Sequence, residues 1–102
     1  MTALIENWGN KIAQELWDTG KSAKLPSVYH QRAKWILEVM HASSKIADVA
    51  AIIQPPMLRP HLLKGSRKGE MAVDILGKTH PWRIVFKFKE GKFLDVKIEN
   101  YH

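Results

Sequence analysis

The most basic stretch of the sequence, RPHLLKGSRKGE at residues 59–70, offers groups that bind and transform anions. Its basic members are Arg59, His61, Lys64, Arg67 and Lys68. The two glycines among them let backbone N–H groups approach an anion closely. The stretch lacks the Gly-Lys-Ser/Thr ending of a P-loop, so it does not predict that kind of nucleotide site. A basic hairpin loop without a ligand is the alternative interpretation.

A second reactive pair, Tyr101 and His102, ends the sequence directly after an alternating apolar run at residues 94–99. A tyrosine hydroxyl donates a hydrogen bond, and an imidazole titrates near physiological pH, so it suits either role in proton transfer. Taken alone, each residue has a simpler explanation, namely a packed tyrosine at a strand end and a solvated histidine.

Together the two groups contain the parts needed to cleave RNA without a metal ion. A base must take the proton of the 2′-hydroxyl, an acid must protonate the leaving 5′-oxygen, and cations must neutralise charge on the phosphate. The candidate catalytic residues are His61, Lys64, Arg83, Tyr101 and His102. The residues expected to contact the RNA elsewhere are Arg59, Arg67, Lys68, Lys87 and Asn100.

Composition limits the other possibilities. The chain has 102 residues, which predicts one domain over residues 1–102, and it has no cysteine. No two histidines are four residues apart, and HExxH is absent, so we expect neither a metal nor a cofactor. We find no signal peptide and no apolar run long enough to cross a membrane, which predicts a cytoplasmic protein without a membrane partner.

The positive charge is unevenly distributed. The net charge is +6, and residues 52–102 hold 10 Lys/Arg against 5 Asp/Glu, whereas residues 1–51 hold 6 against 5. A basic half predicts a polyanionic partner, with nucleic acid first. A solvated basic surface explains the charge equally well.

Helices are expected over residues 9–53. Apolar residues recur at helical spacing after Asn10, and Gly20 offers a C-cap. Ser27 is expected to N-cap a second helix with one apolar stripe, and a short third helical turn is expected at residues 45–53. Residues 3–8 predict a first strand or a lead-in to the first helix.

The sheet is expected over residues 58–102. After Pro60 the spacing of apolar residues changes from the helical period of 3.6 to a period of two. This predicts strands at residues 61–64, 71–75, 82–88 and 94–99, with a tight turn at residues 89–92. Helices followed by an antiparallel meander indicate an α+β fold, with the helices on one face of the sheet. The other face is expected to expose Arg83, Lys87 and Lys97. For the candidate catalytic residues to meet, the last strand must end beside the basic stretch.

Three segments carry a resemblance to a known family: LRPHLLKGSRKGEMAVDI, then WRIVFKF, then GKFLDVKIENYH. In this order they resemble the HigB branch of the RelE superfamily, the toxins of type II toxin–antitoxin modules. The family pattern runs Leu-His-x-Leu-Lys-Gly-x-x-x-Gly, Trp-Arg-Ile-x-Phe and Asp-Tyr-His. The resemblance is strong over residues 58–102 and is colinear but weaker over residues 8–49, where the family also has two helices.

The resemblance implies a RelE-like microbial toxin fold, with N-terminal helices on one face of a curved, mainly antiparallel sheet. It implies an mRNA interferase that enters the ribosomal A site, cleaves mRNA and arrests growth. In that family His61 and Lys64 match the catalytic and phosphate-facing positions, Arg83 matches a phosphate contact, and Tyr101 and His102 match the terminal pair. The implied partner is a HigA-like helix-turn-helix antitoxin, which neutralises the toxin and binds operator DNA with it.

Two departures from the family pattern favour an alternative. Asn100 stands where the family usually has aspartate, and the turn into Trp-Arg-Ile is longer, with His80 and Pro81 extra. A catalytically weak, toxin-like module that acts by binding its antitoxin and operator DNA is therefore the second hypothesis. Inhibition of gyrase, as in other relatives of this fold, is the third hypothesis. It ranks last because those relatives lack the terminal Tyr-His pair.

Overall fold

The structure is a computed structural model that describes residues 4–43, 45–52 and 58–100. Within these residues it has three α-helices, two 3₁₀ turns and one antiparallel sheet in the strand order β1-β2-β3-β4, which confirms the α+β class. The elements are α1 (Lys11–Thr19), η1 (Ser27–Tyr29), α2 (His30–His41), α3 (Ile46–Ile52), β1 (His61–Leu62), η2 (Gly65–Arg67), β2 (Met71–Asp74), β3 (Trp82–Lys89) and β4 (Lys92–Asn100).

Helix α1 begins and ends as its sequence predicts. Asn10 is the N-cap, because its Oδ1 accepts a hydrogen bond from the N–H of Ala13. Gly20 ends the helix in the left-handed region, with φ of 79°. The amide of Asn10 also binds both backbone groups of Ile98 in β4, with Nδ2 2.9 Å from the carbonyl oxygen and Oδ1 3.3 Å from the nitrogen. One side chain thus fixes the start of α1 against the sheet.

We expect Asn10→Ala to lower the free energy of unfolding by about 2–3 kcal/mol, because it removes a helix cap and two hydrogen bonds to β4. Asn10→Asp keeps the acceptor but loses the donor, so its loss is expected to be smaller. Urea unfolding of the two variants beside the wild type measures the difference. Equal stability of Asn10→Ala and the wild type would contradict the anchoring role.

The start of the second helix differs from the prediction. Ser27 opens the 3₁₀ turn η1 rather than capping an α-helix with its side chain, and α2 follows from His30 without a side-chain cap. The predicted apolar stripe is confirmed. Its members Tyr29, Ala33, Ile36, Leu37 and Met40 are all buried.

The hairpin between β3 and β4 forms as predicted. Glu90 and Gly91 both take positive φ, of 53° and 78°, between the paired residues Lys89 and Lys92. Two central residues with positive φ match the right-handed twist of the flanking strands. Gly91 meets this requirement without steric cost.

A β-bulge interrupts β4 at Asp95, whose φ is 51°. Because side chains of a regular strand alternate between faces, an extra residue shifts the pattern by one. Phe93 rather than Leu94 therefore lies in the core with Val96. The unbroken alternation predicted for residues 94–99 is wrong at this point, because the sequence does not mark the bulge.

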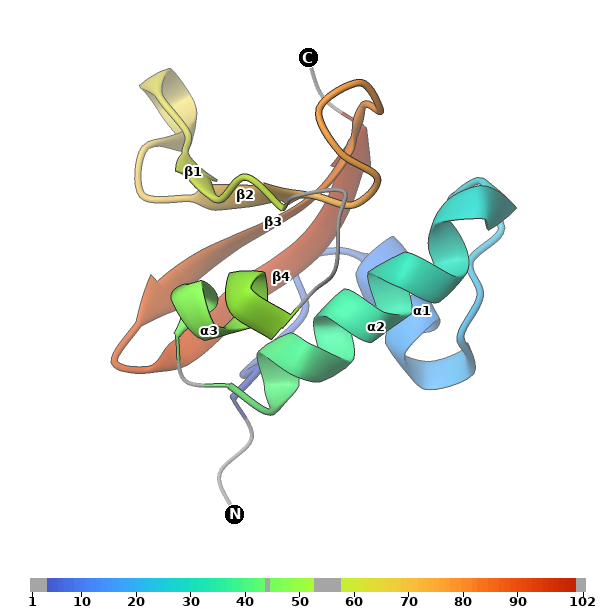
Figure 1. Cartoon of the computed structure of the whole chain (residues 1–102), viewed down its shortest axis with the longest axis horizontal. Helices are drawn as coiled ribbons and strands as arrows, with labels where there is room; N and C mark the ends of the chain where they lie inside the picture. The colour runs from blue at the N-terminus through green and yellow to red at the C-terminus, as the bar shows by residue number, and fades with distance from the viewer. Residues whose placement is uncertain (1–3, 44, 53–57, 101–102) are drawn as a thin grey trace.

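The helices lie on one side of the sheet, as Figure 1 shows, and the core lies between the two layers. Side chains from α1 and α2 join Val73, Ile84, Phe86 and Ile98 of the sheet in one buried cluster. Residues 3–8 were predicted as a first strand or a lead-in to the first helix. In their described part, Ile5 and Trp8 form isolated parallel bridges with β4. Among the described residues, no helix is both long enough and apolar enough to cross a membrane.

Candidate active site

A pocket of about 410 Å³ lies where β1, the start of β3 and the β2–β3 loop meet. Its walls are Arg59, His61 and Arg83 together with residues 78–81, and we call it the basic pocket. The structure therefore brings together His61 and Arg83, two of the five predicted catalytic residues. The last described residue of β4, Asn100, pairs with Trp82 beside the same loop, so β4 ends near this pocket (Figure 1).

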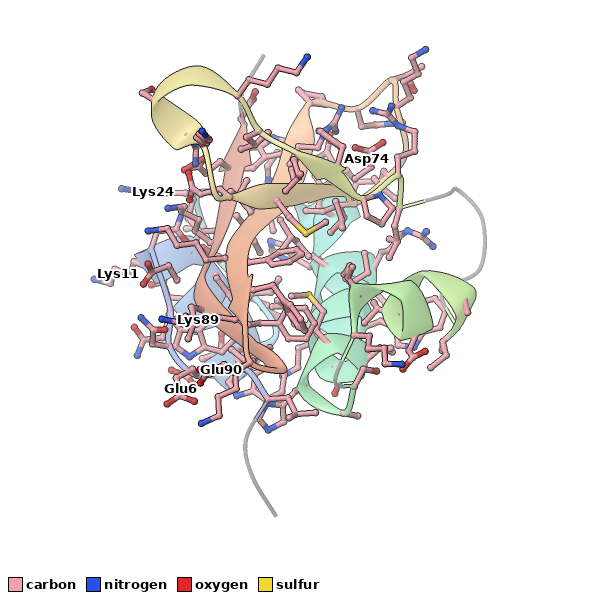
Figure 2. The ribbon with its side chains drawn as sticks, turned by 90° about the vertical axis from the view of Figure 1, so that its left-hand side faces the viewer. Glu6, Lys11, Lys24, Asp74, Lys89 and Glu90 are labelled. Atoms are coloured by element: carbon pink, nitrogen blue, oxygen red, sulfur yellow. The ribbon has the colours of Figure 1, made fainter. Side chains whose placement is uncertain are left out.

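A buried carboxylate organises the basic pocket. Asp74 at the end of β2 has no solvent exposure, and it contacts the Nε atoms of two arginines. The Nε of Arg59 lies 2.5 Å from Oδ2, and the Nε of Arg83 lies 2.8 Å from Oδ1. Figure 2 shows Asp74 at the end of the sheet away from Glu90 and the β3–β4 turn. A buried charge needs such partners, and here one carboxylate aligns two cations.

Arg83 is buried, although the sequence predicted that it would be exposed. Its residue exposure is 9%, because its guanidinium is surrounded by hydrogen-bond acceptors. Besides Asp74, it donates to the backbone carbonyls of Lys78, His80 and Trp82. The strand alternation placed Arg83 correctly on the face away from the helices, but it did not predict that the β2–β3 loop folds over it. Arg83 therefore holds the loop that forms one wall of the basic pocket.

His61 lies on β1, is partly buried and lines the same pocket. Its Nδ1 is 2.7 Å from the carbonyl oxygen of Arg59. Because a carbonyl only accepts, Nδ1 donates, and in the neutral ring the proton lies on Nδ1 while Nε2 is unprotonated. This tautomer suits a base that takes a proton at Nε2.

The segment after β1 forms an ion-pair network over the sheet face away from the helices. Arg67 Nε lies 2.8 Å from Glu70 Oε1, and Arg67 Nη1 lies 2.6 Å from Glu99 Oε2. Lys97 completes the network with its Nζ 2.7 Å from Glu70 Oε2, so Lys97 is less exposed than predicted. Hydrogen bonds to Glu99 and then to Glu70 raise the pKa of Arg67. Arg67, a predicted RNA contact, is thus part of a structural network.

Glu70 makes the stability depend on pH. Burial alone raises its pKa, but the hydrogen bonds and charges of Arg67 and Lys97 outweigh burial, so the pKa lies below its ordinary value of 4.5. A carboxylate with a lowered folded pKa stabilises the protein above its unfolded pKa, and this contribution is lost as the pH falls through the folded pKa.

We therefore expect Glu70→Gln to cost about 1–3 kcal/mol of unfolding free energy near pH 6, because it removes a partner of two charged groups. The difference from the wild type should shrink at an acid pH, because Glu70 itself loses its charge as the pH falls through its lowered folded pKa. Urea unfolding at both pH values measures this, with Glu38→Gln on exposed α2 surface as the control. A difference that grows on acidification would contradict the lowered pKa.

Three other predicted site residues, Lys64, Lys68 and Lys87, do not line the basic pocket. Lys64 and Lys68 line a second pocket of about 510 Å³ formed by residues 62–65 and 68–69. Lys87 is exposed on β3, as predicted, with its Nζ 3.7 Å from Asp95. Tyr101 and His102 lie outside the residues that the structure describes, so their predicted roles stay predictions.

The sequence-based candidate site omitted the buried Asp74 and the four loop residues 78–81 that line the pocket. Asp74 appeared only as a polar position in an alternating strand, although it faces Arg83 across the β2–β3 ladder. Lys78 and His80 belong to the longer turn before Trp-Arg-Ile, and that extra length was the available signal. Within residues 4–43, 45–52 and 58–100, no group of three or more His, Asp or Glu side chains gathers in a way that would hold a metal ion.

Comparison with known proteins does not identify a family. No protein-family model matches the chain, and no curated protein matches it significantly.

Proposed function

We propose that this protein is a RelE-like toxin of a type II toxin–antitoxin system, a ribosome-dependent endoribonuclease that cleaves mRNA without a metal ion. The observation that carries the proposal is the basic pocket, where His61 lies among Arg59, Lys78 and Arg83 beside the end of β4. An imidazole set among cations supplies a group for proton transfer and the charge that stabilises the phosphate during metal-free cleavage. The three motifs of the HigB branch, in family order, support the same activity.

The roles follow from the chemistry of each group. His61 takes the 2′-hydroxyl proton at Nε2, and the attacking oxygen forms a 2′,3′-cyclic phosphate as the bond to the 5′-oxygen breaks. Arg59 and Lys78 neutralise charge on the phosphate, because both cations line the pocket and the side chain of Arg59 is 42% exposed. Arg83 acts as a positioning residue for the pocket wall. Tyr101 and His102 remain candidate members of the site.

Induced expression tests the proposal in cells. We expect growth arrest together with new mRNA 5′ ends inside coding regions, mapped by primer extension. Co-expression with a HigA-like helix-turn-helix protein encoded beside it should restore growth, and the complex of the two should bind operator DNA. Unchanged growth with unchanged mRNA ends after induction would refute the nuclease.

A second function has specific support. The guanidinium of Arg83 contacts Asp74 and three backbone carbonyls, Lys64 lies in another pocket, and Asn100 stands where the family usually has a carboxylate. These features favour a toxin-like subunit that binds its antitoxin and operator DNA with little cleavage of its own. A protein that is inert when induced alone but forms a tight complex with the neighbouring gene product would establish this alternative.

A further inference from the structure

We propose that His80 is a second catalytic residue of the basic pocket and the acid that protonates the leaving 5′-oxygen. The inference rests on the proposed RNA cleavage and deepens it. It gives a role to a loop residue outside the sequence-predicted set, so the described part of the chain holds a candidate for each of the two proton-transfer roles.

The first observation is that the two imidazoles share one pocket. His61 comes from β1 and His80 from the β2–β3 loop, 19 positions later in the sequence, yet both line the same volume of about 410 Å³. The remaining cations of the pocket, Arg59, Lys78 and Arg83, flank them. A phosphodiester bound among these cations therefore lies within the pocket that both rings line.

The second observation is that the loop carrying His80 is held in place. Arg83 donates directly to the carbonyl of His80 and also to those of Lys78 and Trp82. Its Nε is fixed in turn by the fully buried Asp74. The N–H of His80 donates to the carbonyl of Gly77 at 3.3 Å, which closes a turn. A catalytic side chain requires such a supported backbone.

The third observation is that the ring of His80 has defined neighbours. It packs edge-on against Tyr29, with ring centroids 6.1 Å apart and planes at 82°. Tyr29 is only 5% exposed, so it is a fixed surface for this contact. Nδ1 of His80 lies 3.3 Å from the hydroxyl of Thr79. In the imidazolium both nitrogens donate, so Nδ1 is satisfied by Thr79 and Nε2 carries the proton to be transferred.

The proton balance assigns complementary roles to the two rings. Neutral His61 accepts the 2′-hydroxyl proton at Nε2 while the O2′–P bond forms. The P–O5′ bond breaks, its electron pair leaves on O5′, and imidazolium His80 supplies the proton that turns this oxygen into a hydroxyl. One ring gains a proton and the other loses one, so no further reactant is needed.

A sulfur-substituted mRNA tests this assignment on the ribosome. The cleavage site is first mapped with the wild type, and the bridging 5′-oxygen at that site is then replaced with sulfur, which leaves as a thiolate without protonation. We expect His80→Gln to cleave the oxygen substrate about 10²–10⁴-fold more slowly than the wild type. On the sulfur substrate the same variant should come within a few-fold of the wild type, which also shows that its site is intact. His61→Gln should be slow on both substrates.

The outcomes separate this inference from the proposed function. If the wild type cleaves but His80→Gln is as fast on oxygen, or equally slow on oxygen and sulfur, His80 is not the acid and the nuclease stands without it. If the wild type leaves the oxygen substrate intact, the nuclease proposal fails and the role of His80 fails with it. His80→Phe, which keeps a ring against Tyr29 but carries no proton, should behave as His80→Gln does.

Discussion

Asp74→Asn is expected to lower the free energy of unfolding by about 3–5 kcal/mol, because it leaves two guanidinium groups around a neutral amide in a buried site. Asp74 has no exposed surface, and the Nε atoms of Arg59 and Arg83 lie at 2.5 and 2.8 Å from its oxygens. Asparagine offers one acceptor oxygen, so its amide nitrogen must face one of the two donors. Equilibrium urea unfolding measures the loss.

Asp95→Asn is the matched control for Asp74→Asn. Asp95 also lies in the sheet and contacts a cation, Lys87, but that pair is exposed and 3.7 Å apart. Exposed pairs contribute about 0–1 kcal/mol, so this variant should unfold nearly as the wild type does. If Asp74→Asn lost no more than Asp95→Asn, the buried carboxylate would not organise the basic pocket.

His61→Gln is expected to slow mRNA cleavage by about 10²–10⁴-fold, the usual contribution of one group in acid–base catalysis. The half-buried side chain of His61 contributes little to the core, so the unfolding free energy should change by about 1 kcal/mol or less. Time courses of cleavage on programmed ribosomes, paired with urea unfolding, measure both quantities on the same preparation.

His41→Gln, the same substitution at a histidine outside the pocket, is the control for His61→Gln. The ring of His41 packs on Trp17 with centroids 5.1 Å apart, and its Nδ1 accepts from the N–H of Ile5. Losing this packing should cost about 1 kcal/mol of stability and leave cleavage unchanged. Parallel losses of cleavage in both variants would indicate that His61→Gln acts through folding and not through proton transfer.

Local patterns in the sequence were enough to predict most elements of the fold. Asn10 and Gly20 mark the two ends of α1 by side-chain capping and by positive φ, and both signals act within a few residues. Gly91 marks the β3–β4 turn in the same way. The bulge at Asp95 has no comparable local signal, so the alternation prediction failed there. It assigned Leu94 to the core, whereas the structure buries Phe93.

The candidate site was predictable only in part, because its contacts join distant segments. Strand alternation placed Arg83 on the correct face, and the motif placed His61 near it. The burial of Arg83 depends on Asp74 and on a loop whose path the sequence does not specify. Chemistry was assigned to Arg67 from its charge, whereas a network with Glu70 and Glu99 occupies it in the fold.

The chemical identity of the RNA ends tests the account most directly. Purified protein is added to ribosomes carrying an mRNA, and the two fragments are analysed by mass spectrometry. Attack by the 2′-hydroxyl predicts a 2′,3′-cyclic phosphate on the upstream fragment and a 5′-hydroxyl on the downstream one, with no cleavage where the scissile nucleotide lacks its 2′-hydroxyl. A 3′-hydroxyl with a 5′-phosphate, or mRNA that stays intact, would contradict proton transfer in the basic pocket as the function of this protein.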